Sequence, residues 1–179
     1  MAYIGGLSRN RLLLPVIEAA ALLPDVQVHL WGDGPQAGDI ERAVARQANT
    51  HFHGWLASDR LPVHFRAADI IVYLLRLDYP GAVYNAPNTL AQAMAAGRPI
   101  IANDVGDLGR IVRVTQCGLL LQTASPPAIA AAIEQLRDPA LRRRLGDHGR
   151  EAAESTYNTA AMQSQLAQLY ARLLPSAQI

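Results

Sequence analysis

Apolar stretches of two kinds alternate along the chain. Residues 70–73 and 99–102 are continuous apolar runs, which is typical of strands buried on both faces of a parallel sheet. Residues 26–31 alternate between apolar and polar side chains, whereas apolar residues recur at helical spacing in segments such as that from residue 89. These patterns predict strands at 2–5, 26–31, 51–53, 70–73, 99–102 and 119–121, and helices at 11–22, 40–47, 61–68, from 89, around 129–136, from 138 and along 162–173.

Strands that alternate with helices define the fold class. We predict an α/β protein, a Rossmann-like parallel sheet of about six strands with helices on both faces and further helices at the C-terminus. In such sheets ligands bind outside the carboxyl ends of the strands, so the loops at those ends are the candidate sites. The longest irregular segment, residues 76–87, is long enough to be functional.

The charge balance excludes some partners. The formal net charge is +1, which gives no general attraction to nucleic acid or to an acidic membrane. All 16 basic residues are arginines, so a phosphate must be bound by guanidinium groups or backbone amides.

The sequence also predicts a compartment. The single cysteine, Cys117, rules out an internal disulfide, and no apolar run reaches membrane-spanning length. We therefore expect a cytoplasmic protein. A strand that starts at residue 2 also suggests that a preceding part is missing.

The segment 87–104 carries the strongest candidate site. Asn88 is expected to cap the helix that follows, which leaves the N–H groups of Thr89, Leu90 and Ala91 without intrahelical partners. With the positive end of the helix dipole behind them, these amides form an anion site that requires no lysine.

The loop after the first strand offers a second phosphate contact. Gly5 and Gly6 let the backbone approach a ligand closely, and Arg9 or Arg11 could reach a phosphate. Taken alone, the same residues also fit a glycine turn followed by a solvated arginine.

The loop at 32–38 is close to a dinucleotide fingerprint, so an NAD(P)-binding domain is an alternative. Pro35 removes a backbone donor where a pyrophosphate would need one, and no acidic residue ends the next strand. These features favour a tight strand-to-helix turn.

The third loop and the first helical turn after residue 88 could bind a nucleoside. Trp55, which follows Gly54, could wall a base or ribose pocket or, equally, cover the sheet as a partly buried cap. Gln92 lies one turn into its helix, where its amide could bind two hydroxyls. His51 and His53 share a strand face without an acidic or cysteine partner nearby, so we interpret them as structural and expect no metal site.

Several of these segments together resemble a known family. The chain is similar to the C-terminal, donor-binding half of GT-B glycosyltransferases of the retaining family four, also called glycosyl transferase group 1. The resemblance covers nearly the whole chain and rests on blocks in the family's order: 3–8, 31–35, 52–56, 67–69, 93–106 and 138–146.

The resemblance implies a nucleoside diphosphate sugar as donor, no metal, and a role in glycan biosynthesis. It places the diphosphate at Gly5, Gly6, Arg11, Asn88, Thr89 and Leu90, and the ribose and base at Gly54, Trp55, Leu56 and Gln92. The loop facing the sugar would contain Tyr84, Asn85, Ala86 and Pro87.

The resemblance also implies a domain organisation. Residues 1–179 would form one nucleotide-sugar-binding domain, inactive in isolation, with the N-terminal acceptor domain outside the chain and any membrane association through that missing part.

The sequence departs from the family pattern at the residues that matter for catalysis. Tyr84 and Gln92 stand where the family usually has two glutamates, Gly6 and Thr89 stand where it has basic residues, and Arg11 replaces a lysine. The catalytic residues are therefore unassigned. A non-catalytic nucleotide-sugar-binding or interaction domain is the main alternative function, and a nucleotide-sugar 2-epimerase is a second.

Overall fold

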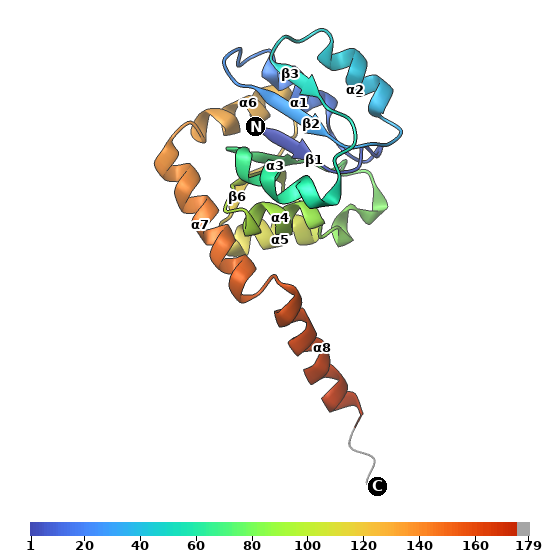
Figure 1. Ribbon diagram of the computed structural model, residues 1–179, viewed down its shortest axis with the longest axis vertical. Coiled ribbons are helices and arrows are strands. Elements are labelled where there is room, and N and C mark those ends of the chain that lie inside the picture. The colour runs from blue at the N-terminus through green and yellow to red at the C-terminus, as the bar shows by residue number, and fades with distance from the viewer. Residues whose placement is uncertain (175–179) are drawn as a thin grey trace.

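A parallel sheet forms the centre of the computed structural model, which describes residues 1–174 (Figure 1). The strand order is β3-β2-β1-β4-β5-β6, and every neighbouring pair is parallel. The strands are β1 (Ala2–Ile4), β2 (Val28–Trp31), β3 (Thr50–Phe52), β4 (Ile71–Tyr73), β5 (Ile100–Asn103) and β6 (Gly118–Leu121). The predicted Rossmann-like sheet is confirmed.

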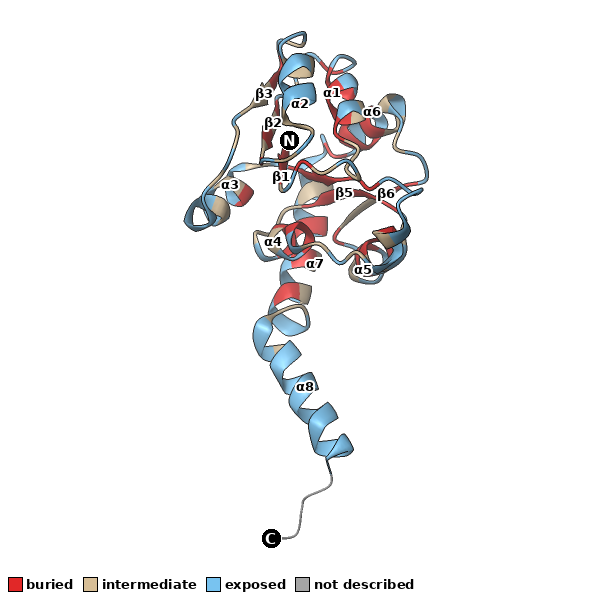
Figure 2. Ribbon diagram, turned by 90° about the vertical axis from the view of Figure 1, so that its right-hand side faces the viewer, coloured by how far each residue is buried: buried red, intermediate tan, exposed pale blue. Residues whose placement is uncertain are grey.

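Helices cover both faces of this sheet, as expected (Figures 1 and 2). Helices α1 (Leu14–Ala20), α2 (Ala37–Val44) and α6 (Pro126–Gln135) pack on one face. Helices α3 (Leu61–Ala67), α4 (Asn88–Ala95), α5 (Gly106–Thr115) and α7 (Pro139–Ser155) lie on the other. Short 3₁₀ helices span η1 (Ser58–Arg60) and η2 (Pro80–Tyr84).

The burial of the strands explains their sequence patterns. Every residue of β4 and β5 is buried, which accounts for their continuous apolar runs. In β2 buried and half-buried residues alternate, in agreement with its alternating sequence. The central strands thus form the core. Because all strands are parallel, their carboxyl ends lie at the same edge of the sheet.

Three helices differ from the predictions. Helix α2 spans Ala37–Val44 rather than 40–47. The first helix was expected at 11–22, but α1 begins only at Leu14, because Arg11 forms an isolated bridge with Leu75 and the Leu12 N–H donates to the Leu74 carbonyl at 3.0 Å. The sequence pattern predicts no helix at residues 106–115, yet they form α5. Glycine at its start and several β-branched residues lower its helix propensity, so its packing against β5 and β6 stabilises it.

Other helix ends agree with the sequence. A glycine ends α4, and a capping side chain begins α7. Gly97, at φ +65°, follows α4, and the Arg98 N–H donates to the Ala93 carbonyl at 2.9 Å, as in a Schellman motif. The side chain of Asp138 caps α7 by accepting from the Ala140 N–H at 2.9 Å.

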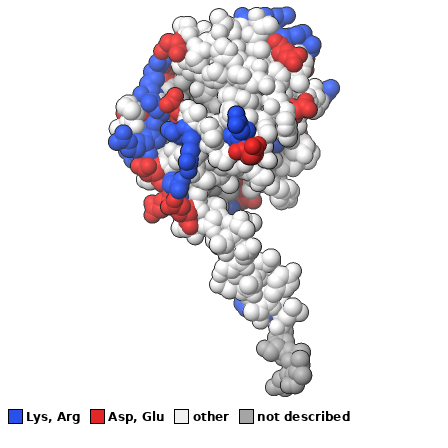
Figure 3. Space-filling view, viewed as in Figure 1, with Lys and Arg blue, Asp and Glu red and all other residues white. Residues whose placement is uncertain are grey.

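The last helix, α8 (Thr159–Leu173), extends away from the sheet (Figures 1 and 2). Its predicted apolar stripe exists, but Met162, Leu166, Leu169, Tyr170 and Leu173 are all exposed. The face seen in Figure 3 shows few charged side chains on α8, whereas they gather over the body of the domain. Within residues 1–174, no helix combines the length and apolar character needed to cross a membrane.

Candidate functional site

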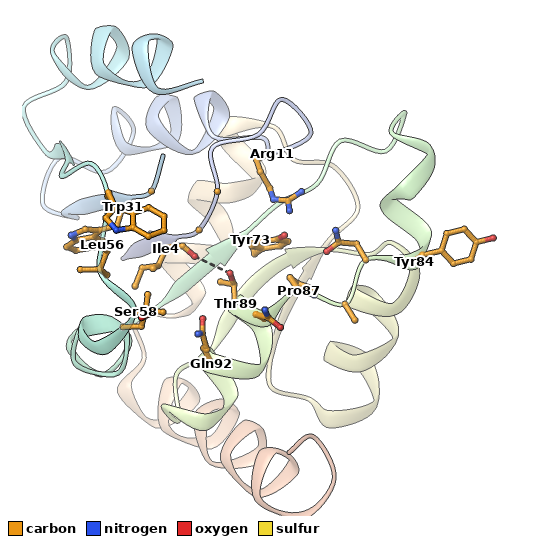
Figure 4. Close-up of a pocket in the computed structure, with 18 residues that line it drawn as sticks. Ile4, Arg11, Trp31, Leu56, Ser58, Tyr73, Tyr84, Pro87, Thr89 and Gln92 are labelled. Carbon is orange, nitrogen blue, oxygen red and sulfur yellow. Dashed lines mark hydrogen bonds between the residues drawn. The ribbon is translucent and has the colours of Figure 1, made fainter. Parts of the chain in front are cut away.

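A cavity of about 620 Å³ opens at the carboxyl ends of the strands (Figure 4). It lies where β1 and β4 adjoin, the point at which the strand order reverses and where sheets of this kind bind ligands. Most of the predicted site residues line it: Gly5, Gly6, Arg11, Trp55, Leu56, Tyr84, Asn85, Ala86, Pro87, Asn88, Thr89 and Gln92. Gly54 and Leu90 do not contribute to the lining.

The N-terminus of α4 begins one residue earlier than predicted. Pro87 is the N-cap, with an extended backbone (φ −74°, ψ 140°), and Asn88 is the first helical residue and makes no capping bond. The prediction that Asn88 caps the helix is therefore wrong. The Leu90 N–H donates to the Pro87 carbonyl at 3.0 Å, so Leu90 offers no free donor. The amides of Asn88 and Thr89 are the ones left for an anion.

A hydrogen bond fixes this helix end beside the first strand. The buried Thr89 hydroxyl donates to the Ile4 carbonyl at 3.1 Å, across 85 residues of sequence. A Cβ on Gly5 would lie 3.4 Å from the Thr89 hydroxyl oxygen and 3.2 Å from the Tyr3 hydroxyl oxygen. The two predicted phosphate contacts, the glycine loop and the helix N-terminus, are thus held against each other.

The turn after β2 supports the first loop rather than offering a dinucleotide site. Gly32 has φ +149°, and a Cβ there would lie 1.9 Å from the Gly5 carbonyl oxygen. The Leu7 N–H donates to the Asp33 carbonyl at 2.9 Å, and the Gln36 side chain donates to the Arg11 carbonyl at 3.2 Å. The glycines therefore allow close contact between two loops, which fixes the backbone of Arg11.

The Arg11 side chain enters the cavity with two of its nitrogens unpartnered (Figure 4). Its Cζ atom lies over the Tyr73 ring, 4.7 Å from the ring centroid. Among residues 1–174, four buried side-chain polar atoms have no hydrogen-bond partner: Arg11 Nε and Nη1, Asn85 Oδ1 and Arg98 Nε. Three of these four belong to residues that line the cavity, so unpaired polar atoms are concentrated in its wall.

The electrostatics of the cavity favour an anion. Within the described chain, Arg11 is the one charged residue in its lining, and no aspartate or glutamate contributes. Burial raises the pKa of Tyr3 and of Tyr73, and the nearby Arg11 guanidinium offsets this only partly. Both phenols are therefore neutral at pH 7, so the guanidinium and the α4 dipole remain unneutralised.

Aromatic and aliphatic side chains form another wall of the cavity, where Trp31 and Leu56 lie together (Figure 4). Trp55 is 75% exposed, which excludes the interpretation of a partly buried cap. Gly54, at φ +70°, instead makes the turn and accepts a hydrogen bond from the Gly32 N–H at 2.8 Å. The Ser58 side chain adds a hydroxyl near this wall.

The loop before α4 divides into inward and outward residues. Tyr84 is 84% exposed and points away from the cavity, whereas Asn85 is half-buried (Figure 4). Gln92 is also half-buried, and its amide is directed into the cavity from α4. The two positions that carry glutamates in the resembling family thus differ in orientation as well as in chemistry.

Histidines stack on the sheet face behind Trp31. The ring centroids of His53 and Trp31 are 4.4 Å apart, and His29 Nδ1 lies 3.0 Å from His53 Nε2. Burial, followed by repulsion from neighbouring histidines, lowers the pKa of His29 and of His53. In residues 1–174, no group of three or more histidine, cysteine, aspartate or glutamate side chains could hold a metal ion.

Among the cavity-lining residues that the sequence did not predict are two aromatic ones, Trp31 and Tyr73. Each is the last residue of its strand. Because ligands bind beyond the carboxyl ends of parallel strands, the last residue of each strand is also a candidate, and this signal points to both residues.

The fold and the cavity define a Rossmann-type domain with a cavity, lined by one arginine, at its topological switch point. The family model for glycosyl transferases group 1 matches residues 1–138, and the chain belongs to this family. The sequence is 26% identical over 176 residues to an alpha-D-kanosaminyltransferase of Streptomyces kanamyceticus, covering 94% of this chain and 44% of that protein.

Solved structures agree with this assignment. A sucrose-phosphate synthase of Thermosynechococcus elongatus superimposes with a TM-score of 0.78 at 29% identity, covering 96% of this chain and 45% of that one. HepE of Anabaena, solved with UDP-glucose, has a TM-score of 0.80 at 18% identity, covers 96% of this chain and 48% of its own, and supports the GT-B fold alone. The chain thus spans less than half the length of each of these relatives.

Proposed function

We propose that this chain is the donor-binding domain of a glycosyltransferase and that its cavity binds a nucleoside diphosphate sugar. The longer protein would transfer the sugar to an acceptor held by a second domain, and the isolated chain would not turn over. Family membership and the structural likeness to HepE, which was solved with UDP-glucose, support this proposal.

One observation carries the proposal: the unpartnered polar atoms gather beside a free helix N-terminus. Arg11 Nε and Nη1 lack acceptors, and the first two amides of α4, at Asn88 and Thr89, lack intrahelical partners. A diphosphate supplies acceptors to all four groups at once. A guanidinium and oriented amides bind such an anion without a metal ion.

The same groups suit the chemistry of sugar transfer. When the bond between sugar and diphosphate breaks, negative charge develops on the leaving diphosphate. Arg11 and the α4 amides are fixed before that charge appears, so they stabilise it without reorganising. The proposal includes the retention of configuration at the sugar that the family implies. The further group that sugar transfer requires is unassigned.

The base, the ribose and the sugar of the donor are matched to residues of suitable chemistry in the cavity. The wall of Trp31 and Leu56 is an apolar surface suited to a base, and the Gln92 amide can pair with ribose hydroxyls. Asn85 Oδ1, buried without a donor, suits a hydroxyl of the sugar. The proposal thus adds Trp31 to the residues expected to contact the base.

A second candidate function follows from the absence of a carboxylate in the described lining of the cavity. A domain that binds nucleotide sugars without transferring them needs no such group. Activity of the full-length parent separates the two functions: nucleotide binding without transfer from any of a panel of donors would favour the non-catalytic domain.

A thermal-shift screen of the chain against UDP, GDP, ADP and dTDP tests the binding itself. We expect at least one of them to raise the melting temperature at millimolar concentration, and calorimetry then gives its dissociation constant. Arg11→Ala should weaken this binding about 10- to 100-fold, because charge-assisted hydrogen bonds are lost.

Arg9→Ala is the matched control for that substitution. Arg9 is an exposed arginine of the same loop and does not line the cavity, so its loss should leave the dissociation constant unchanged. No shift with any nucleotide, or equal effects of the two substitutions, would contradict the proposal.

A further inference from the structure

The Arg11 guanidinium lies over an aromatic ring in the lining of the cavity. Its Cζ atom lies 4.7 Å from the centroid of the Tyr73 ring, while Nε and Nη1 make no hydrogen bond. A cation–π contact places a cation over the face of an aromatic ring and involves no acceptor atom. The contact with Tyr73 therefore restrains the guanidinium without neutralising its charge.

The Tyr73 ring is itself a rigid support. Tyr73 is 3% exposed at the end of β4, and it stacks with Tyr3 on the neighbouring strand, with centroids 6.3 Å apart and planes 16° apart. The Tyr3 hydroxyl donates to the Gly6 carbonyl at 2.7 Å. Because burial keeps both phenols neutral, the ring presents a π surface and not an ion-pair partner.

The backbone of Arg11 is fixed independently of its side chain. It pairs with Leu75 just beyond β4, and its carbonyl accepts from the Gln36 side chain. These contacts place the start of the side chain but not its charged end. The Tyr73 ring contacts the charged end itself.

We propose that Tyr73 is a positioning residue for the donor: its ring holds the Arg11 guanidinium at the cavity by a cation–π contact that leaves the charge free to bind the diphosphate. The inference rests on the proposed function, since it assumes a diphosphate at Arg11. A carboxylate in the place of this ring would fix the guanidinium too, but it would occupy its donors and neutralise its charge.

Two substitutions at Tyr73 test the role of the ring. Tyr73→Phe keeps the ring and should bind the preferred nucleotide, UDP or GDP, within about twofold of the unaltered chain. Tyr73→Leu removes the ring and should weaken that binding about 3- to 30-fold, the range expected for a cation–π contact. Affinity for the parent nucleoside, uridine or guanosine, should not change, because it lacks the diphosphate.

Controls separate positioning from a general structural effect. Tyr170→Leu, at an exposed tyrosine of α8, should change neither affinity. In an Arg11→Met background, Tyr73→Leu should have no further effect on diphosphate binding. An equal weakening in both backgrounds, or weaker nucleoside binding to match, would overturn the inference.

If Tyr73→Leu does not fold, an aromatic side chain with a different charge distribution can replace Tyr73 in the test. Pentafluorophenylalanine incorporated at position 73 conserves the ring but removes the negative charge of its face, so it should bind the nucleoside diphosphate severalfold more weakly than Tyr73→Phe. Equal affinities would overturn the role of Tyr73 and leave the proposed function intact. Failure of the unaltered chain to bind any nucleoside diphosphate would instead overturn the proposed function.

Discussion

Replacing Arg11 by methionine should stabilise the empty chain while abolishing tight donor binding. Arg11 carries two buried donors without acceptors, and each such group costs about 1–3 kcal/mol of folding free energy. The cation–π contact with Tyr73 returns about 0.5–2 kcal/mol. Methionine keeps the packing over the ring through its flexible thioether and removes the unpaired donors.

The balance of these effects gives the expected change in the free energy of unfolding. We expect the free energy of unfolding to rise by about 1 kcal/mol or more in Arg11→Met, in line with the gain seen when buried charges are replaced by apolar side chains. For a chain of this length that corresponds to a rise in melting temperature of about 2–4 °C per kcal/mol.

Differential scanning fluorimetry and urea unfolding of the ligand-free chain measure the stability change, and calorimetry measures nucleotide affinity. The expected result is opposite in sign for the two: higher stability, and about 10-fold or more weaker binding of the nucleoside diphosphate. A ligand-free Arg11→Met chain that melts below the unaltered chain would refute the reasoning. Arg11 would then contribute to the fold and not be held for a ligand.

Three further predictions concern the framework of the cavity. Thr89→Val removes the hydroxyl bonded to the end of β1 at nearly constant volume, and should lower the unfolding free energy by about 1–3 kcal/mol by leaving a buried carbonyl unpaired; unchanged urea midpoints would contradict it. Gly32→Ala should be more damaging than Gly38→Ala, because a Cβ at Gly32 meets backbone at 1.9 Å whereas the nearest atom to one at Gly38 is a flexible arginine end at 3.5 Å; equal melting temperatures would count against it. Because the pKa of His53 is lowered in the folded chain, the unfolded chain binds more protons below about pH 6.5, so stability should fall as the pH drops from 7 to 5, and His53→Gln should flatten that dependence.

Local sequence patterns were sufficient for the sheet because the strands are buried in a uniform way. The continuous apolar runs of β4 and β5 and the alternation in β2 each report the burial of one strand. Helix α5 could not be predicted in this way: Gly106, Gly109 and β-branched residues oppose a helix locally, and packing against the sheet determines the outcome.

The candidate site was predictable where a single segment carries it. The turn into α4 lies in the cavity as expected, although the N-cap is Pro87 and not Asn88. The contact between Arg11 and Tyr73 joins segments 62 residues apart, and it exists because β1 and β4 are neighbours in the sheet. No sequence pattern within either segment indicates that these two strands are neighbours. The contact between Arg11 and Tyr73 could therefore not be predicted from the sequence.

A crystal structure of the chain soaked with the nucleoside diphosphate that binds best is the most direct measurement. The account predicts diphosphate density against the Asn88 and Thr89 amides, with Arg11 Nε and Nη1 within hydrogen-bond distance of its oxygens and the guanidinium still over Tyr73. Density for the diphosphate elsewhere on the chain, or beside an Arg11 that has left the ring, would contradict it.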